Sequence, residues 1–404
     1  MGMQLVMTAK RILEKLESSG FEAYMVGGCV RDMLLNRPLH DIDICTSARP
    51  EEVISLFERT VPTGLKHGTV TVVEDDVPFE VTTFRTEEGY SDYRRPDRVQ
   101  FVDSLKQDLS RRDFTINAMA LDRFDRLYDY FGGRRDLERQ VIRTVGEPRE
   151  RFAEDALRMF RAIRFSGQLG FSVGEKVLSA IRIHRRLLEK VARERITHEF
   201  QKLLQAPYVE QGLRLLWSSG ITRDVSPFHY LHKGLREILS FSIQALTERE
   251  RWVLLLYHMD EQYRASFLHA LRLPKAFVKE IKRLLRHLEH YEHVIDVEDI
   301  PAYDLIRLGE EDFVSLLKLN QLMLNRSVAT DLRQQIRTVL DNLPIRHPQE
   351  LCVNGKDLQL FRKRSPGPWI QEELDRLVKA VVEGKVPNER EAIRAFVMED
   401  EKHE

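Results

Sequence analysis

Cysteine and long apolar runs are scarce in this sequence. The 404 residues include three cysteines, Cys29, Cys45 and Cys352, and none is in CxxC spacing. This excludes a small domain held together by disulfides and favours a reducing compartment such as the cytoplasm. The longest apolar runs, such as 252–257, are far shorter than the roughly 20 residues that cross a membrane. We therefore expect a cytoplasmic protein with no membrane segment.

Glycine, proline and net charge are also low. The chain has 20 Gly and 15 Pro, which excludes collagen-like and low-complexity classes. Its 63 Lys+Arg and 64 Asp+Glu give a formal charge of −1, whereas proteins that bind nucleic acid usually carry basic surfaces. The charge is unevenly divided, however: residues 1–130 contain 17 Lys/Arg and 23 Asp/Glu, and residues 131–200 contain 16 and 10. The average therefore conceals an acidic first part and a basic segment that could bind RNA.

Hydrophobic periodicity predicts an α+β first part followed by helices. Strands are expected at 23–26, 42–45 and 98–102, and a hairpin at 69–73 and 79–84. Helices are expected in the same part at 9–18, 50–58 and 105–111. After about residue 134 the whole chain is predicted to be helical, with apolar residues at helical spacing in 149–169, 176–195, 198–204, 213–218, 248–259, 275–290 and 372–383.

A double glycine and two aspartates form the most informative pattern. Gly27-Gly28 ends the first predicted strand, and Asp41-Ile42-Asp43 lies on the next one. Because alternate residues of a strand share a face, Asp41 and Asp43 present two carboxylates side by side. Such a pair suits Mg²⁺, which takes one or two protein carboxylates and completes its shell with water and phosphate oxygens. The glycine turn lets backbone amides approach an anion, so we predict a site for a metal-bound nucleoside triphosphate.

Other phosphate-binding motifs are missing, and the acidic pair has a simpler explanation. The sequence contains no GxxxxGK[ST] and no GxGxxG motif. Taken alone, an Asp-x-Asp pair on a strand can be an acidic edge that binds nothing. Glu80, on the strand after the hairpin turn, is either a further carboxylate near the metal or part of a solvated strand face.

Residues 26–48, VGGCVRDMLLNRPLHDIDICTSA, resemble the signature of the DNA polymerase β-like nucleotidyltransferases. The resemblance is closest to the bacterial class II branch, which holds CCA-adding tRNA nucleotidyltransferases and poly(A) polymerases. It continues in RRDFTINA (111–118), FGG (131–133), EDALR (154–158) and VNGKDL (353–358), whereas 205–345 carries no matching motif. The resemblance implies an α+β fold with a mixed-sheet catalytic head (1–135), followed by an all-helical neck (136–204), body (205–300) and tail (301–404) that binds tRNA.

The same resemblance implies a reaction. In this family two carboxylates hold Mg²⁺ while the 3′-hydroxyl of a tRNA attacks the α-phosphate of CTP or ATP, and pyrophosphate leaves. Asp41 and Asp43 occupy the matching positions, and Gly28, Arg31 and Arg112 match positions that contact the nucleotide. The implied function is template-independent addition of C, C and A to the 3′ end of tRNA.

The segment 154–164 is expected to select the base. Asp155 and Arg158 are three residues apart and would share one face of a helix. Cytosine and adenine both present an exocyclic amine beside an unprotonated ring nitrogen, so a carboxylate can accept from the amine while a guanidinium donates to the ring. Uracil and guanine present the opposite pattern. The resemblance extends the nucleotide-binding set to Arg161 and Arg164, and the alternative is an ordinary ladder of ion pairs along the helix.

Three alternatives to full CCA addition stay open. CC-adding members lack a flexible loop, and the polar segment 86–96 resembles the loop that CCA-adding members keep. Bacterial poly(A) polymerases typically carry a long basic C-terminal extension, whereas this chain ends in Met398-Glu399-Asp400-Glu401. A noncatalytic RNA-binding protein on the same fold would not need Asp41 and Asp43. The oligomeric state is undetermined, with a homodimer as one option.

Basic residues recur at helical spacing and suggest contacts with tRNA phosphates. Each of these ridges could equally be a solvated helix face. They are Arg182, Arg185, Arg186, Lys190, Arg193 and Arg195; Lys275, Lys279, Lys282, Arg283 and Arg286; and Lys356, Arg362, Lys363 and Arg364 near Trp369. His287, His290 and His293 share i, i+3 spacing, but no cysteine or carboxylate pattern completes a zinc site.

Overall fold

The chain divides into two compact units. The computed structural model describes residues 2–88, 98–327 and 331–400. The first unit is Met1–Leu239 with Gln262–Arg272, and the second is Ser240–Glu261 with Leu273–Glu404. In the described ranges, no helix combines the length and the apolar character that crossing a membrane requires. The finer division into head, neck, body and tail stays a prediction.

The first unit begins with a mixed sheet, as predicted. Among the described residues, seven strands pair in the order β3-β4-β5-β2-β1-β8-β9. β2 and β5 run parallel, and the other neighbours run antiparallel. The strands are β1 (Ala23–Val26), β2 (Asp43–Thr46), β3 (Thr60–Gly64), β4 (Thr69–Glu74), β5 (Val77–Thr83), β8 (Ala120–Leu121) and β9 (Leu127–Tyr128).

The predicted hairpin strands, β4 and β5, show alternating burial. Val70 and Val72 of β4 and Phe79 and Val81 of β5 are fully or almost fully buried, and the residues between them face outwards. The β4–β5 turn consists of Asp75 and Asp76, which have φ of 52° and 59°, the left-handed backbone of a tight two-residue hairpin. β3 was not predicted because most of its side chains are exposed, which leaves no hydrophobic pattern.

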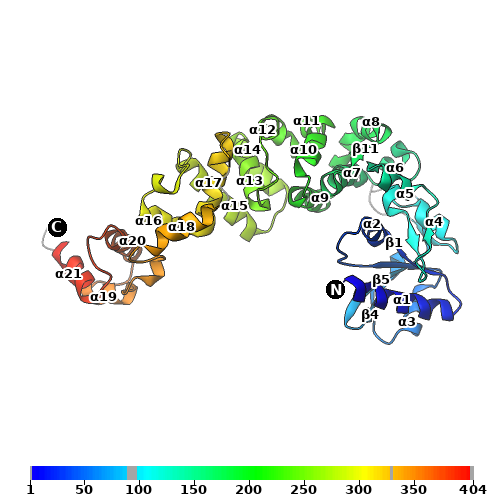
Figure 1. Cartoon of the computed structure of the whole chain (residues 1–404), viewed down its shortest axis with the longest axis horizontal. Helices are drawn as coiled ribbons and strands as arrows, with labels where there is room; N and C mark the ends of the chain where they lie inside the picture. Colours follow the sequence, from blue (N-terminus) through cyan, green and yellow to red (C-terminus); the bar gives the residue numbers. More distant parts are fainter. Residues whose placement is uncertain (1, 89–97, 328–330, 401–404) are drawn as a thin grey trace. The chain divides into compact units, whose positions relative to one another are not determined.

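Helices pack around β2, the central strand of the sheet, which begins at Asp43; we call this end of the strand the sheet edge. α1 (Gly2–Ser18) and α3 (Pro50–Leu56) pack on the sheet and on each other (Figure 1). α4 (Leu105–Ser110) buries two leucines in a cluster with Val26 and Cys45. Since side chains alternate along a strand, Asp43 shares a face with Cys45 and therefore with α4.

A second, two-stranded sheet borders the expected flexible loop. β6 (Arg85–Glu88) pairs antiparallel with β7 (Arg98–Phe101). Most of the segment 86–96 lies outside the described residues, so the loop stays a prediction.

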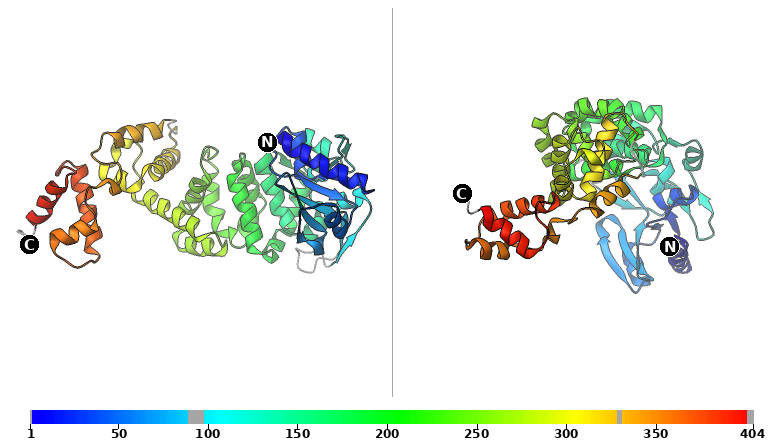
Figure 2. Two further views of the ribbon diagram at one scale, coloured as in Figure 1. Left: turned by 90° about the horizontal axis from the view of Figure 1, so that it is seen from below. Right: turned by 60° about the vertical axis from the view of Figure 1, so that its left-hand side comes forward.

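Helices build most of the rest of the first unit (cyan to yellow-green in Figures 1 and 2). They are α5 (Gly133–Glu138), α6 (Pro148–Glu154), α7 (Leu157–Leu169), α8 (Glu175–His184), α9 (Arg193–Gln205), α10 (Val209–Ser218), α11 (Ile221–Asp224), α12 (His232–Ile238) and α14 (Glu261–Ala270). The expectation of an entirely helical segment is wrong at β10 (Val141–Ile142) and β11 (Ser172–Val173), which pair in parallel. Two-residue strands bury too little to leave a pattern in the sequence.

The predicted helix over 149–169 is broken at Asp155, so Asp155 and Arg158 do not share a continuous helix. α6 ends at Glu154 and α7 starts at Leu157. Asp155 has an extended backbone, with φ of −132°, and its Oδ1 accepts the Leu157 N–H at 3.0 Å. Aspartate commonly ends or caps a helix in this way, because its carboxylate competes for backbone donors. The predicted helix over 176–195 is likewise interrupted, between α8 and α9.

The second unit is helical in its described residues (Figure 2, yellow-green to red). Its helices are α13 (Glu248–Tyr257), α15 (Lys275–His290), α16 (Ala302–Leu308), α17 (Glu310–Met323), α18 (Leu332–Asp341), α19 (Gly355–Arg362), α20 (Trp369–Val382) and α21 (Arg390–Asp400). Asp312 of α17 is 1% exposed and bonds Arg249 of α13 and Arg283 of α15, both at 2.7 Å. The VNGKDL motif forms a capping box that starts α19, in which Asn354 and Asp357 each accept from the other's backbone N–H.

Candidate active site

Asp41 and Asp43 are exposed on either side of the buried Ile42, as the alternation predicted, although Asp41 precedes the strand that was expected to carry it. β2 starts at Asp43, and Ile42 and Ile44 are buried at 2% and 0% exposure, whereas both aspartates are exposed. Glu80 of β5 is the direct register partner of Asp43 and is also exposed. Glu80 thus lies beside Asp43 on an exposed strand face, so both explanations for it stay open.

Negative charge accumulates at this edge. Although the Asp43 side chain reaches solvent, the surrounding protein removes water from its carboxylate and raises the pKa of Asp43 to about 6. Arg112 opposes this rise, and the charges of Asp41 and Glu80 add to it. Within the described residues, the side-chain oxygens of Asp41 and Asp43 accept no hydrogen bond and form no ion pair. A cation at this edge would relieve the repulsion.

The carboxylates of Asp41 and Asp43 could supply part of the coordination shell of a divalent cation, and a bound substrate would supply the rest. In residues 2–88, 98–327 and 331–400, no group of three or more His, Cys, Asp or Glu converges on a point where it could hold a metal ion. Two carboxylates supply hard oxygen donors and leave room for water and phosphate oxygens, which is the arrangement that Mg²⁺ favours. Asp41 and Asp43 therefore fit a divalent ion that binds together with a triphosphate.

Gly27 brings Arg112 close to Asp43. Its φ is 84°, and a Cβ at this position would lie 3.0 Å from Nη1 of Arg112 and 3.9 Å from Oδ2 of Asp43. Any side chain would thus strain the backbone and fill the space between the two charged groups. Gly28 follows as the first residue of α2 (Gly28–Leu34), and a Cβ there would be 3.7 Å from Nη2 of Arg31.

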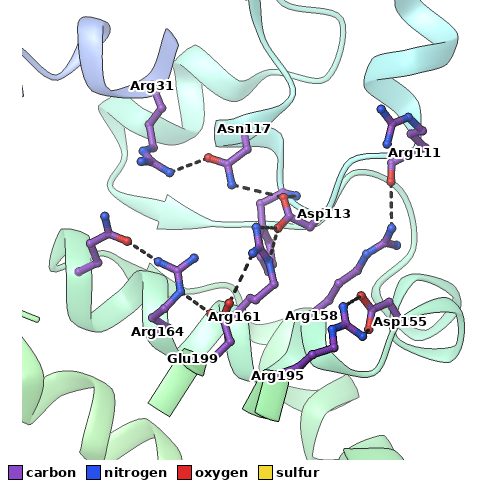
Figure 3. Close-up of polar contacts among 12 residues, drawn as sticks. Arg31, Arg111, Asp113, Asn117, Asp155, Arg158, Arg161, Arg164, Arg195 and Glu199 are labelled. Carbon is purple, nitrogen blue, oxygen red and sulfur yellow. Dashed lines mark hydrogen bonds and ion pairs between the residues drawn. The ribbon is translucent and has the colours of Figure 1, made fainter. Parts of the chain in front are cut away.

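A chain of polar contacts leads from α2 to the helices that follow the sheet (Figure 3). Arg31 is 5% exposed and donates to Asn117 at 2.8 Å. Asn117 donates to Asp113 at 3.3 Å, and Asp113 accepts from Arg161 at 2.8 Å and 2.6 Å. Burial would raise the pKa of Asp113, but Arg161 and Arg158 outweigh it and hold that pKa at about 2. Asp113 is therefore a fixed negative charge that orients Arg161.

Glu199 of α9 ends this chain of contacts. It accepts from Arg164, and Arg161 lies 3.6 Å away (Figure 3). The ring of Phe165 faces Arg31, Arg161 and Arg164, whose guanidinium carbons lie 5.3, 5.3 and 3.8 Å from its centroid. An aromatic face and a buried carboxylate thus hold the arginines in one arrangement.

A pocket of about 220 Å³ lies beside these contacts. Its lining is strongly polar and consists of Arg111, Arg112, Asp113, Asp155, Leu157, Arg158, Arg161 and Arg195. The four residues Arg112, Asp155, Arg158 and Arg161, which the sequence predicted to contact a nucleotide, thus meet in one place. The other predicted residues lie outside the lining: Arg31 and Arg164 in the network behind it, and Gly28, Asp41 and Asp43 at the sheet edge.

Arg158 and Asp155 are held by other residues and not by each other. Arg158 donates to Glu154 at 2.7 Å, to the Arg151 carbonyl at 3.3 Å and to the Arg111 carbonyl at 2.9 Å. These bonds use three of the five N–H groups of the guanidinium. The ladder alternative is therefore correct in part, since Glu154 and Arg158 form an i, i+4 ion pair.

Asp155 takes its second partner from a distant helix. It accepts the Leu157 N–H and two bonds from Arg195 of α9, at 2.8 and 3.4 Å (Figure 3). Three of its roughly four acceptor positions are thus filled. Asp155 therefore keeps an acceptor position and Arg158 keeps N–H donors. The exocyclic amine and the ring nitrogen of one base edge would use these groups.

Sequence reasoning missed the partners that fix this geometry. Asp113 and Asn117 lie inside the RRDFTINA motif, which was a usable signal. Arg195 was assigned to an RNA-binding ridge, and the structure places it on Asp155 instead. In the same ridge Arg185 pairs with Asp224, and Arg193 donates to the Ser226 carbonyl. Glu199 carried no signal, because its partners are 35 and 38 residues away.

Comparison with known proteins agrees with this architecture. Residues 23–143 match the family model "Poly A polymerase head domain", residues 170–231 match "Probable RNA and SrmB- binding site of polymerase A", and residues 243–397 match tRNA nucleotidyltransferase domain 2. The CCA-adding enzyme of Bacillus cytotoxicus is 40% identical over 392 residues, which cover 97% of this chain and 98% of that protein. The chain belongs to the family of CCA-adding enzymes. The enzyme of Bacillus subtilis is also 40% identical, over 96% of both chains.

Solved structures of the family have the same fold. The Bacillus stearothermophilus CCA-adding enzyme in complex with CTP superposes with a TM-score of 0.88 at 38% identity, over 98% of each chain. The Thermotoga maritima CCA-adding enzyme complexed with tRNA superposes with a TM-score of 0.64 at 21% identity, over 99% of this chain and 98% of that one. The predicted family and fold class are thereby confirmed.

Proposed function

We propose that the protein adds C, C and A in turn to the 3′ end of tRNA, using CTP and ATP and releasing pyrophosphate. Family membership over 97% of the chain supports the reaction. The single observation that carries it to these residues is the pocket where Asp155 and Arg158 are fixed beside Arg112 and Arg161. The protein's three free cysteines favour the cytoplasm as its compartment.

The selection of C and A over U and G is assigned to two side chains. Asp155 accepts a hydrogen bond from the exocyclic amine, and Arg158 donates one to the unprotonated ring nitrogen. Uracil or guanine would turn a carbonyl towards Asp155 and an N–H towards Arg158, which leaves buried groups unpaired. A site built for hydrogen bonding rejects such a base strongly. Arg161 and Arg112 line the same pocket and are assigned to the phosphates.

Asp41 and Asp43 are proposed to hold the divalent cation, which we take to be Mg²⁺. Bound there, the cation would neutralise charge on the triphosphate and lower the pKa of the attacking 3′-hydroxyl. Arg112 lies between this edge and the base-selecting pocket, because it approaches Asp43 across Gly27 and also lines the pocket. The chain can thus orient a nucleotide with its base at Asp155 and its phosphates at Arg112.

Three tRNA transcripts test the proposal, ending before CCA, after C and after CC. Each is incubated with the purified protein, Mg²⁺ and one labelled nucleotide at a time. We expect CMP on the first two transcripts, AMP on the third, and no UMP or GMP on any. Addition of C without A would replace the proposal with CC addition, and long A tracts would replace it with poly(A) synthesis. No incorporation would favour a noncatalytic RNA-binding protein.

A further inference from the structure

A basic pocket in the second unit has no assigned role. Its volume is about 550 Å³, and it lies between α15 and α16, far along the sequence from Asp155. We call it the α15–α16 pocket. It is lined by Arg283, Arg286, His287, His290, Tyr291, Asp304, Arg307 and Leu308.

Positive charge dominates this lining. The lining contains three guanidiniums and one acidic side chain, Asp304, whose negative charge adds to burial in raising the pKa of Tyr291. Arg283 is bound by the buried Asp312, at 2.7 and 3.1 Å. For Arg286, the structure gives within the described residues a bond of 3.4 Å to the Lys282 carbonyl and no ion pair.

The guanidiniums of Arg283, Arg286 and Arg307 all lie close enough to His287 to affect its pKa. Burial lowers the pKa of His287, and Arg283, Arg286 and Arg307 lower it further, although Asp312 faces the ring and opposes them. His287 is therefore available as a neutral donor at neutral pH. Arginine with neutral hydrogen-bond donors is the chemistry that binds phosphate oxygens.

α15 extends the basic surface away from the pocket. Lys275, Lys279, Lys282 and Arg286 are exposed at spacings of four, three and four residues, which places them along one side of the helix. Eleven residues of helix span about 16 Å. A line of charge of this length suits a chain of phosphates better than a single small anion.

We propose that the α15–α16 pocket binds a phosphate group, and that the RNA backbone of the tRNA substrate supplies it. This rests on the proposed function for the identity of the RNA, but binding is measured without any turnover. Phosphate contacts position RNA without reading its sequence, so the pocket would fix the register of the substrate.

Salt-dependent binding of tRNA tests the proposal. Arg286→Gln and Arg307→Gln are each expected to reduce the magnitude of the slope of log K against log salt by about 0.9 between 50 and 200 mM. Arg286→Lys keeps the charge and should keep the slope. Lys385→Gln is the matched control, because Lys385 is paired with Glu383 at 2.7 Å. Asp304→Asn removes the opposing charge and should tighten binding, an effect opposite in sign to any loss of folding.

Inorganic tripolyphosphate separates the two sources of phosphate. It is titrated while the ring signals of His287 and His290 are followed by NMR, with and without tRNA. Signals that tRNA shifts, and that Arg286→Gln no longer shifts, support the RNA assignment. A shift with tripolyphosphate alone, together with unchanged tRNA slopes in both variants, would overturn it in favour of a free polyphosphate. Unchanged slopes and no shift overturn the site, whereas failure of wild-type incorporation with these effects intact overturns only the proposed function.

Discussion

The two parts of the candidate active site, the sheet edge and the pocket beside α7, differ in how their charged side chains are paired. At the sheet edge, Asp41 and Asp43 have no internal partners in the described structure, and Glu80 adds further negative charge beside them. In the pocket beside α7, Asp155 and Arg158 are each held by three hydrogen bonds. Among the described residues, Arg112 approaches Asp43 but no ion pair forms with either aspartate, whereas Asp155 and Arg158 already have bonded partners in the pocket.

This difference suggests that the edge binds a cation and that the pocket selects the base. Repulsion between like charges destabilises the folded state, and a cation that binds together with the substrate would relieve this repulsion. Side chains locked by their neighbours present a fixed pattern of donors and acceptors, which is what selection between similar bases requires. Substitutions at the edge should therefore affect rate without affecting stability, and substitutions in the pocket should affect stability or selectivity.

The largest effect is expected at the edge. Asp43→Asn, or Asp41→Ala, should reduce CMP incorporation by about 10³-fold or more, because the ion's contribution of several kcal/mol to the transition state is lost. Affinity for tRNA, measured by filter binding, should stay the same. The melting temperature should be unchanged or slightly higher, since a like charge has been removed. A fall of several degrees would break the comparison, because it would show that the edge carries stability.

A large loss of stability is expected at Arg161, in the lining of the pocket. Arg161→Gln leaves Asp113, whose side chain is 11% exposed, without its main partner. Removing one partner of a buried ion pair costs about 3 kcal/mol or more. Urea unfolding at pH 7 should show this loss, and Asp113→Asn in the same background should recover part of it. Full stability of Arg161→Gln would contradict a locked pocket.

The same pair makes the loss depend on pH. The pKa of Asp113 is about 2 in the folded protein and roughly 3.9 when unfolded. Because the pKa is lowered on folding, the carboxylate stabilises the fold at pH values above the unfolded pKa, and that contribution, about 2–3 kcal/mol, is lost as pH falls towards 2. The difference between wild type and Arg161→Gln should therefore be greatest above pH 5 and shrink below pH 4. An equal difference at pH 3 and pH 7 would refute this origin.

Elements with a strong local pattern could be predicted from the sequence. β1 and α15 have the predicted bounds, because β1 ends at the Gly27-Gly28 turn and α15 keeps a 3–4 apolar repeat along its length. The exposure of Asp41 and Asp43 on either side of the buried Ile42 was also expected from the local pattern. Asp155 is the counter-example: its own carboxylate ends a helix that the apolar pattern continues through.

The partners in the site could not be predicted in this way. Arg161 bonds a residue 48 positions away, and Arg195 bonds one 40 positions away. Such pairs depend on how α7, α9 and the segment before α5 pack, which no local period encodes. Motifs therefore suggested which residues form the site, and only the packing showed which of them hold one another.

A moderate loss of selectivity is expected at Arg158. Arg158→Ala removes the donor to the ring nitrogen, and the preference for CTP over UTP should fall by about 10- to 100-fold, the effect of 1–3 kcal/mol for a hydrogen bond to a charged group. The measurement is kcat/KM for each nucleotide on tRNA that ends before CCA. Arg158→Lys is the control, since it keeps the charge but loses the planar fork. Unchanged exclusion of UTP would refute the assignment of base selection to this residue.

The smallest effect is expected at Arg195, and it separates two roles for one side chain. If Arg195 positions Asp155, Arg195→Gln leaves the carboxylate with the Leu157 N–H alone, and the preference for CTP over UTP should fall by up to about tenfold, the effect of roughly 1 kcal/mol. Affinity for tRNA should stay the same, and Arg195→Lys should recover part of the selectivity. Arg193→Gln is the matched control, because Arg193 bonds the Ser226 carbonyl and does not line the pocket. Weaker tRNA binding with intact selectivity in Arg195→Gln would instead return this residue to the RNA-binding ridge that its helical spacing first suggested.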